Sequence, residues 1–239
     1  MSPRRGERRP SSRASRRFDI VFEDDVLIVV EKSAMVLTVP TPRGETNTLA
    51  DLVERYLHRP GARRRKIEVV QRLDRETSGL IVFGKDRRTG DALRAQFRDR
   101  KPLRVYFALV AGVIEEDGGT YDSRLETNRA LTRYSTDDDE RGQRAVTHYR
   151  VEGRGADVTL VRVRLETGRR NQIRVQFAEA LHPVLGDRRY RADLALHRLW
   201  PHQRLALHAA VLGFDHPVTG QEMRFEAPLP REFGALISR

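Results

Sequence analysis

The stretch QRLDRETSGLIVFGKD, residues 71–86, places a carboxylate beside two guanidinium groups at the entrance to an apolar run. Its TSG triplet is typical of a turn, and the LIVF that follows predicts a buried strand. Side chains alternate along extended backbone, so Arg72 and Asp74 are expected on one side while Leu73 packs on the other. We therefore expect Asp74 on a connection that leads into a sheet, next to a cation.

The chemistry of Asp74 has two interpretations at this point. Cationic neighbours favour the ionised carboxylate, which suits a nucleophile or a base better than a proton donor. A structural ion pair that anchors the strand explains the same pattern, because ion-pair networks perturb carboxylates as readily as active sites do. The stretch alone leaves both open.

The rest of the chain is rich in strand-like segments and poor in helices. Apolar and β-branched runs predict strands within 18–30, 105–110, 145–151, 158–165 and 206–214. Helices are expected over 48–56, with Thr48 as the N-cap, and over 89–99. The acidic run STDDDE, 135–140, is expected at a solvated hairpin tip. Strands that do not alternate regularly with helices favour an α+β fold with a largely antiparallel mixed central sheet over a doubly wound parallel one.

The composition fits a folded protein with a polyanionic partner. The 239 residues include 45 Lys and Arg against 34 Asp and Glu, a net charge of +11, and 38% of them are hydrophobic. Arginine dominates the excess and suits bidentate contact with phosphate. The absence of cysteine excludes disulfides, thiolate metal sites and thiol nucleophiles. No apolar run approaches membrane-spanning length and no signal-peptide core is present, so we expect a soluble cytoplasmic protein without a membrane partner.

Residues 1–17, MSPRRGERRPSSRASRR, contain seven arginines, one glutamate and no apolar periodicity. Such a segment cannot bury enough surface to order itself, so a disordered basic arm is expected. Its charge favours nonspecific binding of RNA over an inert tail, and a targeting presequence fits the same composition. A second basic cluster, residues 63–66, is expected in a loop. Together with the arm it would frame a path for the phosphates of RNA.

Further motifs accompany the Asp74 stretch in a fixed order. They are KPLRVYFALVAG (101–112), GQRAVTHY (142–149), LETGRRNQIRVQF (165–177) and HPVLGDRRY (182–190). Together with QRLDRETSGL they resemble the motifs of the RluA-type RNA pseudouridine synthases. The resemblance runs from about Phe18 to Phe233, and five ordered motifs over that length are far more specific than any one of them.

The resemblance implies one pseudouridine-synthase catalytic domain over 18–239, an isomerase that acts on uridines of structured ribosomal or transfer RNA. It assigns catalysis to Asp74, Tyr106 and Arg174, with Arg174 paired to the aspartate. It assigns substrate binding to Arg72, Arg75, Asn171 and Gln172. His182 and Asp187 are expected to shape their loop. No cofactor is implied, the spacing of the histidines predicts no metal site, and a monomer is expected.

The implied reaction gives each catalytic group a task. A uridine stacked in RNA must be extruded into a pocket, where Arg72 would contact the flipped nucleotide or fill its vacated place. An ionised Asp74 would attack ribose C1′ or remove a ribose proton, and the sequence leaves these alternatives open. Tyr106 would stack on the uracil near the C5 proton that must leave, and Arg174 would keep Asp74 charged.

Two other functions fit parts of the sequence. A catalytically silent RNA-binding protein would share the basic charge, but it would not need the set of Asp74, Tyr106 and Arg174. A uracil C5 methyltransferase is excluded by the missing cysteine, because that chemistry uses a thiolate.

The chain departs from the family pattern at several positions. Gln71, Asn171 and Gln176 stand where histidines are usual, and residues 31–40, EKSAMVLTVP, lack the usual Lys-Pro-Ala-Gly. These changes put the substrate in doubt more than the activity. The family often carries a small RNA-binding domain before the catalytic one, and we expect none here because about seventeen residues precede Phe18.

Overall fold

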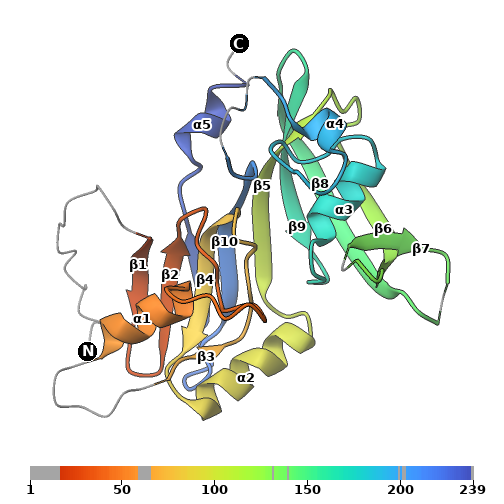
Figure 1. Cartoon of the computed structure of the whole chain (residues 1–239). Coiled ribbons are helices and arrows are strands. Elements are labelled where there is room, and N and C mark those ends of the chain that lie inside the picture. Colours follow the sequence, from red (N-terminus) through yellow and green to blue (C-terminus); the bar gives the residue numbers. More distant parts are fainter. Residues whose placement is uncertain are drawn as a thin grey trace.

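The computed structural model describes residues 17–58, 66–130, 132–138, 140–198, 200 and 203–237 (Figure 1). The predicted basic arm, up to residue 16, and most of the 63–66 cluster lie outside the described residues. Arg17, which we assigned to the arm, is hydrogen-bonded to the folded part: its carbonyl accepts from Ser33 N at 3.0 Å, and its guanidinium donates to Asn47 O at 3.2 Å.

The α+β prediction is confirmed. The strands are β1 Phe18–Glu23, β2 Leu27–Lys32, β3 Glu68–Val69, β4 Ser78–Gly84, β5 Leu103–Ala111, β6 Gly118–Thr127, β7 Arg133–Thr136, β8 Gln143–Arg154, β9 Val158–Leu165, β10 Leu207–Asp215 and β11 Glu222–Glu226. The helices are α1 Leu49–Leu57, α2 Arg87–Arg98, α3 Gln172–Glu179, α4 Ala192–Ala195 and α5 Arg231–Gly234. Among the described residues no helix is long and apolar enough to cross a membrane.

The strands form one mixed sheet in the order β1-β2-β4-β10-β5-β9-β8-β6-β7, with β11 beside β10 and β3 beside β4. Every named pairing between described strands is antiparallel except that of β4 with β10, in which Ser78 lies opposite His208. Because these two central strands are parallel, the segments that precede them enter the sheet side by side, at the same end of its strands. The Asp74 stretch is one of those segments.

The centre of the sheet is buried on both faces, which explains why β2 and β4 have continuous apolar sequences. Side chains of β4 alternate between the two faces. Ile81 packs in the cluster that contains Val53 of α1, and Val82 packs in the cluster that contains Leu93 of α2. In Figure 1, α1 and α2 flank the β1–β4 half, while α3 and α4 lie by the β6–β9 half.

Local signals in the sequence explain where α1 begins and why the second residue of β4 is a glycine. The predicted N-cap is confirmed: Thr48 Oγ1 accepts from Asp51 N at 3.3 Å, and the Asp51 carboxylate accepts from Thr48 N at 3.0 Å, a capping box. Gly79 has a φ of +115°, and a Cβ there would lie 2.2 Å from the carbonyl oxygen of Ala209 on β10. Only glycine allows the two strands to approach this closely.

The prediction for the acidic run was wrong. β7 and β8 both pair with β6, on opposite sides, so they are not partners in a hairpin. The described residues between them belong to a connection that passes across β6. The acidic composition correctly indicated a polar connection but carried no information about which strands it joins.

Candidate active site

A cavity of about 460 Å³ opens where the Asp74 stretch, the start of α3 and the loop after α3 meet. Its volume lies within the range typical of small-molecule sites. The segment that leads into β10 completes its wall. The lining residues are Met35, Asp74, Arg75, Glu76, Arg170, Asn171, Arg174, Gly186, Arg188, Arg189, Gln203 and Leu205.

Asp74 is placed at the cavity by its neighbours in the chain. Leu73 is 7% exposed, and its backbone is bonded in both directions to the hydroxyl of Thr38, at 2.8 and 3.2 Å. Thr77 N donates to Asp74 O at 3.2 Å, which closes the turn before β4. The predicted alternation is confirmed, because Leu73 is buried while Arg72 is exposed and Asp74 is partly exposed.

The predicted ion pair between Asp74 and Arg174 is confirmed. Arg174 Nη1 donates to Asp74 Oδ2 at 2.9 Å, across 100 residues of sequence. α3 carries Arg174, whose side chain is 11% exposed. The carboxylate of Asp74 is 29% exposed, so it remains accessible from the cavity while one of its oxygens is fixed.

A second carboxylate, that of Asp187, holds the other edge of the same guanidinium. Arg174 Nε donates to Asp187 Oδ2 at 2.6 Å and Nη2 to Oδ1 at 2.9 Å, and Asp187 is fully buried. The ring of Tyr190 lies 5.2 Å from the guanidinium carbon. Burial alone would lower the pKa of Arg174, but the hydrogen bonds and charges of Asp187 and Asp74 outweigh it and raise that pKa. Arg174 is therefore permanently charged, and hydrogen bonds to two carboxylates hold its guanidinium.

The sequence prediction for Asp187 was incomplete. Asp187 does shape its loop, because Oδ1 accepts from Arg189 N at 2.8 Å and from Tyr190 N at 3.2 Å. It also orients Arg174, which the sequence analysis missed. The signal that could have found this role is electrostatic, since an arginine buried at a helix start requires more than one partially exposed carboxylate to neutralise it.

Tyr106 lies in β5, with Ala209 of β10 and Val163 of β9 beside it. It is 9% exposed, packs in the main hydrophobic cluster and is not among the residues that line the cavity. Burial raises the pKa of its phenol, and the negative charge of Asp74 acts in the same direction against the opposing effect of Arg104. The phenol is therefore protonated at neutral pH, and it lies near enough to Asp74 for the charge of that carboxylate to affect its pKa.

Only two of the four predicted substrate-binding residues line the cavity. Arg75 and Asn171 line the cavity, and Arg72 is exposed outside its lining. Asn171 has a left-handed φ of 56° and donates from Nδ2 to the Tyr190 hydroxyl at 3.0 Å.

Gln172, by contrast, is turned away from the cavity and is only 2% exposed. Its amide oxygen accepts from Thr167 Oγ1 and Arg169 N, and its nitrogen donates to Val146 O and Thr147 Oγ1, at 2.8 to 3.0 Å. This placement ties α3 to β8 and corrects the expectation that the Gln172 side chain faces a substrate.

The motifs also gave no sign of Lys32, which is fully buried beside the Asp74 turn. Its ammonium donates to three carbonyls, Ser33 O at 3.0 Å, Val36 O at 2.8 Å and Arg75 O at 3.2 Å. Burial lowers its pKa to about 7, although the charges of Glu76 and Asp74 oppose that shift. Lys32 thereby joins the turn after β2 to the segment that carries Asp74.

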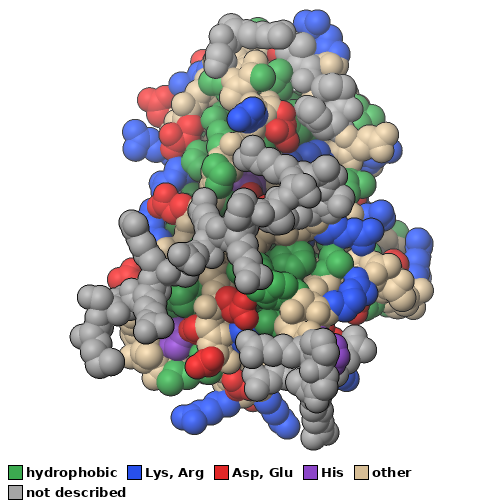
Figure 2. Space-filling view, turned by 90° about the vertical axis from the view of Figure 1, so that its left-hand side faces the viewer, with side chains coloured by type: hydrophobic (Ala, Val, Ile, Leu, Met, Phe, Trp, Pro, Cys, Tyr) green, Lys and Arg blue, Asp and Glu red, His purple; other side chains and the backbone are tan. Residues whose placement is uncertain are grey.

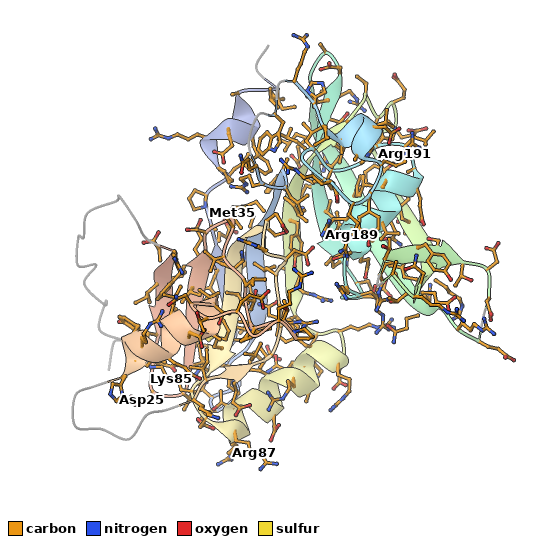
Figure 3. The ribbon with its side chains drawn as sticks, viewed as in Figure 1. Asp25, Met35, Lys85, Arg87, Arg189 and Arg191 are labelled. Carbon is orange, nitrogen blue, oxygen red and sulfur yellow. The ribbon has the colours of Figure 1, made fainter. Side chains whose placement is uncertain are left out.

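The cavity is basic overall, since five of its lining residues are arginines and two are acidic. Figure 3 labels Arg189 by the loop after α3 and Met35 on the β2 side. On the face seen in Figure 2, the basic and acidic side chains of the described residues are interspersed. No group of three or more His, Asp or Glu side chains among the described residues is arranged to hold a metal ion. The site offers a fixed, accessible carboxylate inside a pocket suited to an anion.

Comparisons with known proteins all point to one family. Residues 26–179 match the RNA pseudouridylate synthase family. The chain is 36% identical over 228 residues to an uncharacterized RNA pseudouridine synthase, YlyB, of Bacillus subtilis, covering 92% of this chain and 71% of that protein. It is 36% identical over 230 residues to the ribosomal large subunit pseudouridine synthase D of Pseudomonas aeruginosa, with the same coverage. The fold resembles the human RNA pseudouridylate synthase domain containing 4, with a TM-score of 0.72, 24% identity, and coverage of 92% and 91% of the two chains.

Proposed function

The chain belongs to the RNA pseudouridylate synthase family, and from that premise we propose that it isomerises specific uridines of large-subunit ribosomal RNA, with Asp74 as the reacting carboxylate. The observation that carries the proposal is the immobile ion pair of Asp74 with Arg174 at the wall of a basic cavity. The names of relatives such as the Pseudomonas aeruginosa protein support ribosomal RNA over transfer RNA.

The proposed reaction conserves every atom of the uridine. The bond from ribose C1′ to N1 breaks, the uracil turns within the pocket, C1′ bonds to C5, C5 loses its proton and N1 gains one. Asp74 acts either by attack on C1′ or by removal of a ribose proton. In both cases Arg174 holds one oxygen of the carboxylate in place through the 2.9 Å hydrogen bond.

The other residues bind and orient the nucleotide. Arg75 and Arg189 line the cavity and are proposed to hold phosphates, and the exposed Arg72 to contact the flipped nucleotide or its vacated place. Tyr106 is proposed to approach the uracil from the β5 side once the base is bound. A neutral phenol suits stacking or proton donation better than proton removal, so we assign Tyr106 a contact with the ring. We further propose that the protein acts as a monomer in the cytoplasm and without a membrane.

The test combines cells and purified protein. Pseudouridine is mapped in RNA from cells with and without the protein, which identifies the uridine. Purified Asp74→Asn protein is then assayed on a fragment of that RNA. The amide keeps the shape of the carboxylate but is a poor nucleophile and base, so product is expected to disappear while most of the RNA affinity remains. A folded Asp74→Asn protein that still forms pseudouridine would refute the assignment, and loss of folding, binding and activity together would favour a purely structural ion pair.

A further inference from the structure

The turn after β2 contains an unusual residue at the mouth of the cavity. Met35 has a φ of 67°, in the left-handed region that glycine adopts without steric strain. Its side chain is 43% exposed and belongs to none of the hydrophobic clusters formed by the described residues. A large apolar side chain gains little for folding in such a position, and backbone outliers of this kind cluster at ligand sites.

The turn is fixed against the segment that carries Asp74. The ammonium of Lys32 bonds the carbonyls of Ser33 and Val36, on either side of Met35, and also the carbonyl of Arg75. The hydroxyl of Thr38 adds the second connection, to Leu73. Met35 therefore has a set position relative to Asp74.

Met35 differs in kind from the other cavity residues. Most of them are charged or polar, and the other large apolar residue, Leu205, is 2% exposed. Arginines suit the phosphates and the ribose of a nucleotide, but a nucleobase also presents an apolar face that requires an apolar contact. Figure 3 places the labels of Met35 and Arg189 on different sides of the site, one near β2 and the other near α3.

We propose that Met35 packs against the base of the RNA nucleotide that enters the cavity and thereby orients that base toward Asp74. The inference rests on the proposed function, since it assumes an RNA substrate at this site. It assigns Met35 a role in recognition of the base and no part in the chemical step.

The chain contains a matched control for the unusual backbone. Leu181 has a φ of 65° and is 59% exposed, so it shares both features of Met35. Its conformation has a local explanation, because Leu181 N donates to Ala178 O and His182 N to Phe177 O, the Schellman pattern that ends α3. Leu181 does not line the cavity.

The first experiment compares Met35→Gly, Met35→Asn, Met35→Leu and Leu181→Gly in single-turnover assays on the mapped RNA fragment. Glycine and asparagine tolerate a positive φ, so melting temperatures are expected to stay at or above that of the wild type. Met35→Gly and Met35→Asn are expected to lose about tenfold in apparent affinity, and Met35→Leu, which keeps an apolar side chain, to lose less. Leu181→Gly is expected to remain near the wild type. A Met35→Gly protein within twofold of the wild type would overturn the proposal.

The second experiment asks whether the contact is to the base. In the Asp74→Asn background, which prevents turnover, affinity is measured for the RNA fragment and for the same fragment with an abasic ribose at the mapped position. The loss caused by Met35→Gly should disappear with the abasic RNA, and an equal loss with both RNAs would refute a contact to that base. A wild-type protein that makes no pseudouridine in the RNA would instead refute the proposed function.

Discussion

At the scale of the residue, the site depends on one arginine shared by two unequal carboxylates. Asp187 is fully buried and binds Arg174 through two nitrogens, whereas Asp74 is partly exposed and binds it through one. The two carboxylates therefore have different roles: Asp187 holds the guanidinium in place, and the guanidinium orients Asp74. We therefore expect Asp74, the carboxylate that faces the cavity, to contribute less to the stability of the fold than Asp187 does.

This division predicts different results for the two carboxylates. Asp187→Asn leaves the buried charge of Arg174 with a single partner, so the free energy of unfolding should fall by about 3–5 kcal/mol. Turnover at saturating RNA, measured well below the melting temperature, should also fall because Arg174 is no longer oriented. Urea denaturation and single-turnover assays measure both effects, with Asp74→Asn as the comparison that keeps most of its stability. Wild-type stability and turnover in Asp187→Asn would contradict this account.

The motifs revealed the pair of Asp74 and Arg174 but not the buried partner of Arg174, Asp187. Asp74 and Arg174 stand in separate motifs whose family resemblance pairs them, and the pairing is present. Asp187 lies 13 residues from Arg174, and Lys32 lies 43 residues from Arg75, whose carbonyl it binds, so a single local pattern cannot reveal these contacts. Gln172 shows the converse: the family resemblance assigned it to substrate binding, but α3 turns its side chain into the protein.

A buried histidine gives a prediction for acid stability. Ser78 Oγ lies 2.8 Å from His208 Nδ1, and Arg204 Nη2 donates to the same oxygen at 2.7 Å. Burial, aided by the positive charge of Arg204, lowers the pKa of His208 to about 4. An unfolded histidine has a pKa of about 6.5, so the unfolded state binds the extra proton between these values.

Stability from His208 should therefore be fully present above pH 6.5 and be lost as the pH falls toward 4. We expect the wild type to lose about 2–3 kcal/mol more than His208→Asn between pH 7 and pH 4.5. Asparagine offers an acceptor near the position of Nδ1 but does not titrate. Urea denaturation at the two pH values gives the comparison, and parallel losses in the two proteins would show that His208 is not the acid-sensitive group.

At the scale of the element, the parallel pair of β4 and β10 decides where the cavity forms. The two strands place the Asp74 stretch and the segment with Leu205 side by side, at the same end of the central strands. The close approach at Gly79 permits this pairing. The sequence predicted both strands, but periodicity describes the faces of a strand and not its neighbours. For the same reason the connection between β7 and β8 was misassigned.

Gly79→Ala tests the importance of this approach. The added Cβ would meet the backbone of Ala209 at 2.2 Å, which no side-chain movement can relieve, so we expect a loss of more than about 4 kcal/mol or failure to fold. Gly44→Ala is the matched control, because Gly44 also has a positive φ, +72°, but nothing lies within 4 Å of the position that a Cβ would take there. That variant should lose only about 1 kcal/mol. Equal melting temperatures for the two variants would contradict the steric explanation.

At the scale of the whole molecule, positive charge is unevenly divided along the chain. Residues 1–17 hold seven of the 45 basic residues and one of the 34 acidic ones, so they carry six of the eleven excess positive charges. The much longer remainder carries the other five, and arginines line its cavity. We therefore expect the general attraction to RNA and the proposed placement of one nucleotide to be separable.

Deletion of residues 1–16 tests whether the general attraction to RNA depends on this segment while the reaction does not. Arg17 is retained because it is bonded to the folded part. Each phosphate contact contributes about 0.7 to 0.9 to the slope of log affinity against log salt concentration, so three or more contacts from the deleted arginines would lower the slope by about 2 or more. Melting temperature and turnover at saturating RNA should remain unchanged, since the catalytic carboxylate and its partners lie elsewhere. A variant of full length with serine in place of the six arginines before Arg17 separates charge from length and should match the deletion. If both proteins keep the wild-type slope, the segment does not contact RNA, and the attraction must come from the cavity and its surroundings alone.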